Sequence, residues 1–126
     1  MQTTTNDQTQ TKTDKTVKKV DAASSPKGEM NQTYLVSGKA MSMRMWKKHP
    51  PTDGHEPHSR DYETVGFVVE GKAKLHLGGQ EILLEPGDSW LVPAGATHRY
   101  EILEALTAVE ATSPPARIED RDDPPS

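Results

Sequence analysis

The sequence predicts an all-β fold, a jelly-roll barrel of short antiparallel strands, and two observations support this prediction. From Thr33 onward, short apolar runs are separated by turn residues at intervals of about eight to twelve residues, a spacing typical of sandwiches and barrels. Helical periodicity does not persist for three turns in this stretch. Strands joined by tight turns pair antiparallel, and a closed or two-sheet jelly roll hides their edges.

The expected strands follow from the apolar runs and the turn residues between them. Gly71, Gly78-Gly79 and the Pro-Gly pair at 86–87 mark turns, and we expect Gly71 to form a hairpin between two separate strands. The predicted strands are 33–36, 40–48, 64–70, 73–77, 81–84, 89–92, 98–103 and 106–111.

Residues 40–48 show strict alternation. Met41, Met43 and Met45 occupy every second position, and the residues between them are polar or mixed. Successive side chains on a strand point to opposite faces. We therefore expect the methionine row to pack in the core.

Two polar ends flank the predicted folding unit. Only 32% of the chain is hydrophobic, and residues 1–28 and 113–126 are rich in Thr, Gln, Lys, Pro and acidic residues. Such segments bury too little apolar surface to offset the entropy of ordering them. The sequence thus predicts one domain at 29–112 between disordered tails.

Bulk properties narrow the partners and the compartment. The net charge is −4 with no strongly basic segment, so nucleic acid is not an expected partner. No apolar stretch approaches the length of a signal-peptide core or a membrane span, and there are no cysteines. We expect a cytoplasmic protein that does not bind membranes.

Residues 87–98 resemble the second sequence motif of the cupin family. Gly87, Pro93, Gly95 and His98 stand at the fixed positions of that motif. Ile102 replaces the Asn that usually ends it. The resemblance implies a small single-domain cupin, a double-stranded β-helix with a polar pocket, and several small cupins form homodimers through their sheets.

The first cupin motif is only partly present. If Gly71 closes it, His58 occupies the position of the first histidine, Arg60 that of the second, and Thr64 that of the glutamate. Glu63 lies one residue out of register, and a bulge could turn it inward as a substitute.

The resemblance implies a candidate metal site. His58, Glu63 and His98 would hold a divalent ion, iron, manganese, nickel or zinc, as in the two-histidine, one-carboxylate triad. His55 could also turn inward from its loop. Arg60 argues against this site because a guanidinium cannot coordinate a cation, although it anchors carboxylates and phosphates well.

Three functions are compatible with these residues. The first is a metal-binding cupin that also binds a small molecule, which would be an anion if Arg60 points inward. The second is a metal-free binding module in which Arg60, His98 and Tyr100 contact the ligand; Trp90 is a further predicted contact. The third, ranked last, is a metal-free sugar-nucleotide isomerase or epimerase with a histidine base and a tyrosine acid. An inward Gly66 would keep the pocket open.

Overall fold

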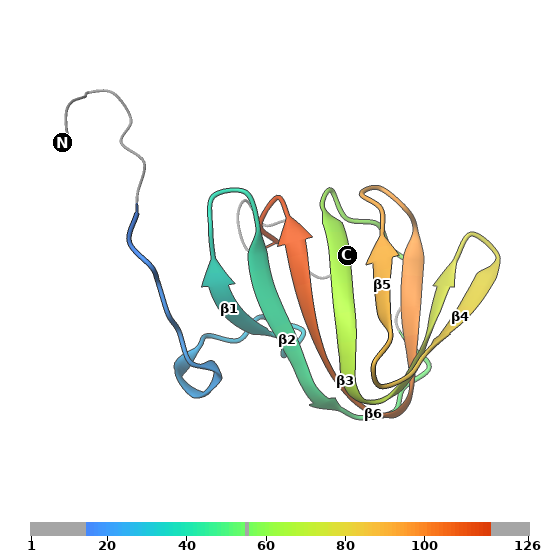
Figure 1. The fold of residues 1–126 in the computed structure, drawn as a ribbon. Coiled ribbons are helices and arrows are strands. Elements are labelled where there is room, and N and C mark those ends of the chain that lie inside the picture. The colour runs from blue at the N-terminus through green and yellow to red at the C-terminus, as the bar shows by residue number, and fades with distance from the viewer. Residues whose placement is uncertain (1–14, 55, 117–126) are drawn as a thin grey trace.

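A computed structural model describes residues 15–54 and 56–116, and nearly all of their regular structure is β (Figure 1). The predicted all-β fold is confirmed. The described elements are η1 (Ala22–Ser24), β1 (Thr33–Ser37), β2 (Ser42–His49), β3 (Glu63–Leu77), β4 (Gln80–Leu84), β5 (Ser89–Val92) and β6 (His98–Ser113). The short strands β1, β4 and β5 lie within a residue of their predicted positions.

The predicted hairpin at Gly71 is wrong, because β3 continues through this residue. Gly71 has φ +89°, and a Cβ there would collide with the carbonyl of Ala105 on β6. The register of β3 against β6 shifts on both sides of this point. Gly71 therefore bends a long strand where two backbones approach closely, which is a common role of glycine inside strands. The two predicted strands at 98–103 and 106–111 are likewise one strand, β6.

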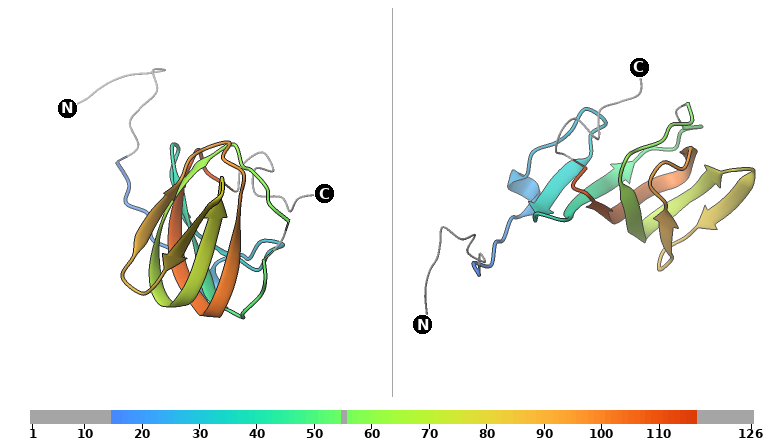
Figure 2. Two further views of the ribbon diagram at one scale, coloured as in Figure 1. Left: turned by 90° about the vertical axis from the view of Figure 1, so that its right-hand side faces the viewer. Right: turned by 90° about the horizontal axis from the view of Figure 1, so that it is seen from above.

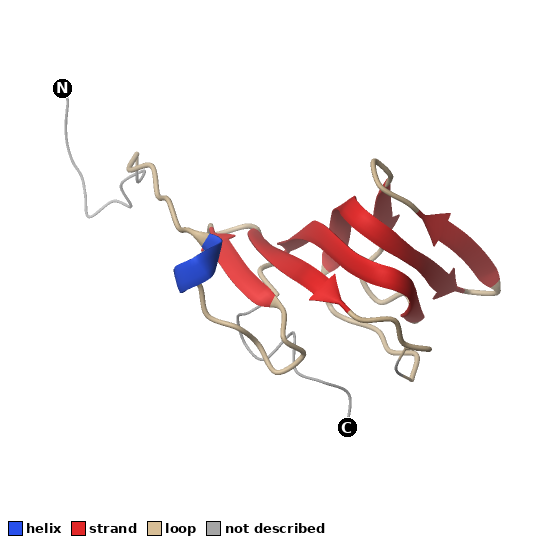
Figure 3. Ribbon diagram, turned by 90° about the horizontal axis from the view of Figure 1, so that it is seen from below, coloured by secondary structure: helices blue, strands red, loops and turns tan. Residues whose placement is uncertain are grey.

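Because of the bend, the two halves of β3 pair with different strands in two parts of the barrel. The strand order is β1-β2-β6-β3-β4, and β5 pairs with the first half of β3 while β4 pairs with its second half. The strands curve around a shared interior (Figure 2). The helical turn η1 lies beside β1 at one end (Figure 3).

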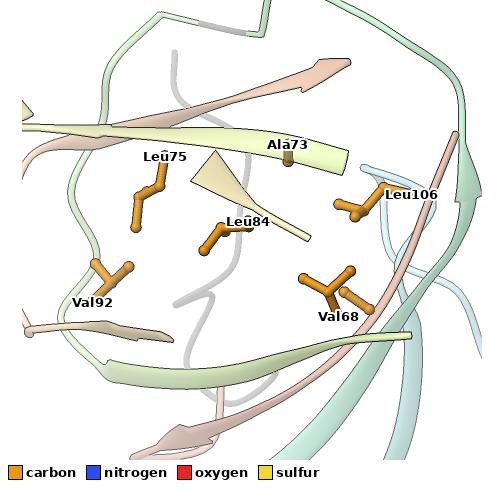
Figure 4. Packing of buried hydrophobic residues seen from close by; sticks show 7 residues of the cluster. Val68, Ala73, Leu75, Leu84, Val92 and Leu106 are labelled. Atoms are coloured by element: carbon orange, nitrogen blue, oxygen red, sulfur yellow. The ribbon is translucent and has the colours of Figure 1, made fainter. Parts of the chain in front are cut away.

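The apolar core is small and occupies one part of this interior. Its buried members come from β3, β4, β5 and β6 (Figure 4). They are Val68, Ala73, Leu75, Leu84, Val92, Leu106 and Ala108. The rest of the interior, toward β2, is lined by charged, polar and aromatic side chains together with a few aliphatic ones.

Met41, just before β2, and Met43, on β2, are exposed and Met45 is half-buried, so the prediction that this row packs in the core is wrong. Met41 and Met43 are 57% and 39% exposed, whereas Ser42 and Arg44 are buried. The alternation was predicted correctly, but the buried face is the polar one. The interior at β2 holds an ion pair and a cavity instead of a packed apolar core.

Ordered structure extends somewhat beyond 29–112 at both ends. Lys27 forms a β-bridge with Thr33, and Ala116 is buried and donates its N–H to the hydroxyl of Thr112. The remaining parts of the predicted tails, 1–14 and 117–126, lie outside the described residues. None of the described residues forms a helix long and apolar enough to cross a membrane.

Candidate functional site

A cavity of about 180 Å³ opens into the polar part of the interior. Its walls come from β2, β3, β5, β6 and the loop between β2 and β3. The lining side chains that matter most here are Arg44, Trp46, His58, Arg60, Tyr62, Trp90, His98, Tyr100 and Glu110.

One row of residues crosses four strands on the inner face, and three of its four members line this cavity. Arg44 pairs with Glu110, Glu110 with Gly66, and Gly66 with Trp90. A Cβ at Gly66 would collide with the indole ring of Trp90. The glycine thus allows the indole to lie against the sheet.

Arg44 and Glu110 form a buried ion pair. Nε of Arg44 donates to Oε1 of Glu110 at 2.6 Å, and the two side chains are only 8% and 2% exposed. The Trp46 indole donates to the same oxygen at 2.7 Å, and Nη1 of Arg44 donates to the Tyr62 hydroxyl at 3.1 Å. The guanidinium also lies near the rings of Trp46 and Tyr62, at 5.2 and 5.4 Å from their centroids.

Nothing in the sequence analysis identified this cluster. The available indication was an acidic residue, Glu110, inside an otherwise apolar and small run on a predicted strand. A charge at such a position is rarely buried unless it is paired. Its partner lies 66 residues away in the chain, so only the fold reveals the pair.

The structure brings His58 and His98 together. Their backbones form a two-residue antiparallel bridge, with reciprocal N–H to carbonyl distances of 2.9 and 2.8 Å. The ring centroids are 4.9 Å apart. The bridge fixes the loop before β3 against the start of β6, so both imidazoles line the cavity.

His98 is held as a neutral imidazole. It is 7% exposed, and this burial lowers the pKa of its side chain, with smaller opposing effects from the Ala96 carbonyl and Glu110. Nδ1 lies 2.9 Å from the Ala96 carbonyl oxygen, which can only accept. We therefore assign the proton to Nδ1, which leaves Nε2 as a hydrogen-bond acceptor.

Tyr100 lies next to His98 in the cavity, with 5.5 Å between the ring centroids. Its hydroxyl accepts a hydrogen bond from the Trp90 indole at 3.0 Å. Burial, with a further contribution from Glu110, raises the pKa of this phenol far above its usual range. Tyr100 therefore remains protonated and keeps its O–H as a donor.

Arg60 lines the cavity from the loop between β2 and β3. Its carbonyl accepts the N–H of Gly95 at 2.8 Å, which ties the loop to the turn before β6. Its guanidinium contacts the sulfur of Met30, with 3.8 Å between Nη2 and Sδ.

Glu63 does not reach the cavity. It is exposed at the start of β3, opposite Ser113, whereas its neighbour Thr64 is buried and lines the cavity. Within the described residues, no three His, Cys, Asp or Glu side chains gather as a metal site. His55 lies outside those residues. Among the described residues, the neighbouring imidazoles of His58 and His98 therefore have no third such side chain gathered with them, which does not fit a three-ligand centre.

Comparison with known proteins identifies the fold as that of a cupin domain. The family model for the cupin domain matches residues 45–111. A crystal structure of an RmlC-like cupin from Shewanella frigidimarina superposes with a TM-score of 0.69 at 18% identity, covering 83% of this chain and 96% of that one.

Two curated sequences show closer local similarity. The mouse 3-hydroxyanthranilate 3,4-dioxygenase is 46% identical over 58 residues, which is 46% of this chain and 20% of the dioxygenase. An uncharacterised protein of Streptomyces coelicolor is 37% identical over 65 residues, 51% of this chain and 60% of that protein. This chain thus spans about a fifth of the length of the dioxygenase it matches.

Proposed function

Because this chain belongs to the cupin family, with the domain model matching more than half of it, we propose that its barrel interior binds a small anionic molecule. The binding we propose does not depend on a three-ligand metal centre. The observation that supports it most is the charge of the cavity lining.

The cavity is positive in an acidic protein. Among the described residues of the lining, the side chains of Arg44, Arg60 and Arg99 are cationic and that of Glu110 is the single carboxylate. The whole chain has a net charge of −4. A concave site with such an excess of guanidinium groups attracts anions, and guanidinium binds carboxylate or phosphate with paired hydrogen bonds.

The size and the walls of the cavity favour a small molecule with a flat apolar part. Its volume, about 180 Å³, is below the roughly 300–1,000 Å³ of pockets that hold drug-sized ligands. Trp46, Tyr62, Trp90 and Tyr100 line it. Aromatic walls favour a planar ring through stacked or edge-to-face contacts.

The neutral polar groups complement this charge. The O–H of Tyr100 donates, and Nε2 of neutral His98 accepts. The substrate named for the mouse relative, 3-hydroxyanthranilate, is an aromatic carboxylate. We therefore use aromatic carboxylates as probes.

A metal-dependent function is the second candidate. His58 and His98 are neighbours, and an acceptor at Nε2 is the form in which histidine binds metals. Iron, manganese, nickel or zinc would need a further protein ligand to complete a usual site. Because no third such side chain gathers with these two among the described residues, no metal-dependent step is proposed.

Calorimetric titration of chelator-treated protein with benzoate tests the proposal. We expect saturable one-to-one binding, weakened at least tenfold in Arg60→Gln. Lys74→Gln is the matched control, because it removes a positive charge from β3 outside the cavity lining. Equal affinity in wild type and Arg60→Gln would remove the role of Arg60, and the absence of binding by any small anion would refute the proposal.

The partner we propose for the outer face is a second copy of this chain. Two adjacent outer rows are Met43-Ala111-Val65-Leu91 and Met45-Val109-Phe67-Ser89. Val65, Phe67 and Leu91 are each about half exposed, at 49%, 45% and 51%. Contiguous exposed apolar surface of this kind marks interaction sites.

The chain's own remaining segments do not suit this surface. Apart from prolines, residues 1–14 and 117–126 contain Met1 and Ile118 as their only apolar residues. A second copy presents the same apolar face, and a two-fold axis would bring the two faces together as packed sheets. We therefore propose a homodimer through the outer faces of β2, β6, β3 and β5.

A further inference from the structure

Glu110 has one carboxylate oxygen that the described residues leave without a hydrogen bond. The residue lies on β6 in register with Arg44, lines the cavity, and has a side chain only 2% exposed. Both hydrogen bonds to its carboxylate, from Arg44 and Trp46, end on Oε1.

The second oxygen, Oε2, receives no hydrogen bond from any residue in 15–54 or 56–116. A carboxylate offers about four acceptor positions on its two oxygens. Buried polar atoms in native proteins nearly always have a partner, and an unmet one is costly. Glu110 is thus held in a fixed orientation by one oxygen while the other remains available at the cavity.

We propose that Oε2 of Glu110 accepts a hydrogen bond from a hydroxyl or amino group of the bound anion. This inference rests on the proposed function and narrows its ligand class. The ligand is a compact carboxylate or similar anion that also carries a hydrogen-bond donor. Arg60, from the loop before β3, binds the anionic group, and Glu110, near the C-terminal end of β6, binds the donor.

The proposed hydrogen bond to Oε2 makes Glu110 the residue that distinguishes ligands with a donor group from ligands without one. Water in the cavity can satisfy Oε2 when no ligand is present. A ligand without a donor displaces that water and leaves a buried carboxylate oxygen unpaired. Sites built to hydrogen-bond a substrate group discriminate strongly against analogues that lack it.

A ligand series on the wild-type protein provides the first test. The probes are benzoate, the three hydroxybenzoates, 2-aminobenzoate, and the methoxybenzoate that matches the best hydroxybenzoate in position. We expect the best donor-bearing probe to bind at least tenfold more tightly than both benzoate and its methoxy analogue. Equal affinities would overturn the inference and leave the proposed function standing, whereas no binding by any probe would remove the proposed function itself.

The variant Glu110→Gln provides the second test. Its amide oxygen can still accept from Arg44 and Trp46, and its NH₂ group then occupies the place of Oε2 and cannot accept. We expect the preference for donor-bearing probes over benzoate and the methoxy analogue to disappear. Glu81→Gln, an exposed position on β4, is the matched control and should keep the preference. A full preference in Glu110→Gln would contradict the inference; if this variant does not fold, the wild-type series decides alone.

Discussion

On four strands of this barrel the inner face is polar and the outer face is apolar, the reverse of the usual arrangement in a sheet protein. On β2, β6, β3 and β5, the inner row Arg44-Glu110-Gly66-Trp90 is charged or aromatic apart from its glycine. The adjacent outer row, Met43-Ala111-Val65-Leu91, is entirely apolar. Polar side chains face inward where the interior is a cavity, and apolar ones face outward where we propose a partner.

This difference shows that burial alone does not fix the polarity of a strand face. The apolar cluster around Leu75 and Leu84 stabilises the part of the barrel formed with β4. The remaining interior can then hold an ion pair and a cavity, at a cost in stability that its hydrogen bonds reduce. Substitutions on the inner face should therefore affect stability and ligand binding, and substitutions on the outer face should affect self-association.

The largest expected effect is on the inner face. Arg44→Ala leaves Glu110 buried without its cation, and breaking a buried pair in this way costs about 3–5 kcal/mol. Lys47→Ala, on the same strand but exposed, should change the free energy of unfolding by less than about 0.5 kcal/mol. Urea denaturation measures both. Similar values for the two variants would mean that the ion pair contributes no more than a surface charge.

On the outer face, Phe67→Asp should separate the proposed dimer without affecting the cavity. A charge placed in an apolar interface should weaken self-association about a hundredfold, close to 2.8 kcal/mol. Sedimentation equilibrium would show this shift, and Gln80→Asp on β4 is the matched control. Benzoate affinity should be unchanged in both. A monomeric wild-type protein, or a dimeric Phe67→Asp, would remove the role we give this face.

Gly66→Ala also alters the inner row, and we expect it to destabilise the protein less than Arg44→Ala. The new Cβ forces the Trp90 indole to move, and such overpacking costs about 1–3 kcal/mol. We expect reduced stability and weaker ligand binding, because the Trp90 to Tyr100 hydrogen bond is disturbed. Gly38→Ala, where the nearest atom would lie at 3.5 Å, should be close to neutral. Unchanged tryptophan fluorescence and stability in Gly66→Ala would show that the indole does not pack as described.

The smallest expected effect concerns pH. Because the pKa of His98 is lowered in the folded state, its stabilising contribution is present above about pH 6.5 and is lost as the pH falls below that value. The slope from this one proton is at most about 1.4 kcal/mol per pH unit. His98→Gln should unfold with a flatter pH dependence between pH 8 and 5. If the free energy of unfolding depended on pH equally in the wild type and in His98→Gln, His98 would have the same pKa in the folded and unfolded states.

Much of the fold was predictable because it depends on local patterns. The tight turns at Gly78-Gly79 and Pro86-Gly87 follow from residue type, and the cupin motif at 87–98 indicated the family. The structural role of Gly71 was not predictable from local patterns. Whether a glycine turns a strand or bends it depends on the carbonyl of Ala105, a contact that no local pattern encodes.

The site shows the same limit. His98, Tyr100 and Trp90 could be proposed from the motif and from alternation, and the structure places all three at the cavity. Glu63 was proposed from an assumed bulge, but β3 begins in regular alternation and keeps this residue exposed. Arg44 and Glu110 were missed because their pairing is long-range, and because an outward-facing methionine row looks like a core row in sequence.

Tryptophan fluorescence offers the most direct test of the central claim that the polar interior is a metal-independent anion pocket. The chain has two tryptophans, Trp46 and Trp90, and both line the cavity, so the signal reports on this site. Titration of chelator-treated protein with benzoate should give a saturable change that added iron, manganese, nickel or zinc does not alter. A change that appears only after one of these metals is added would contradict the account.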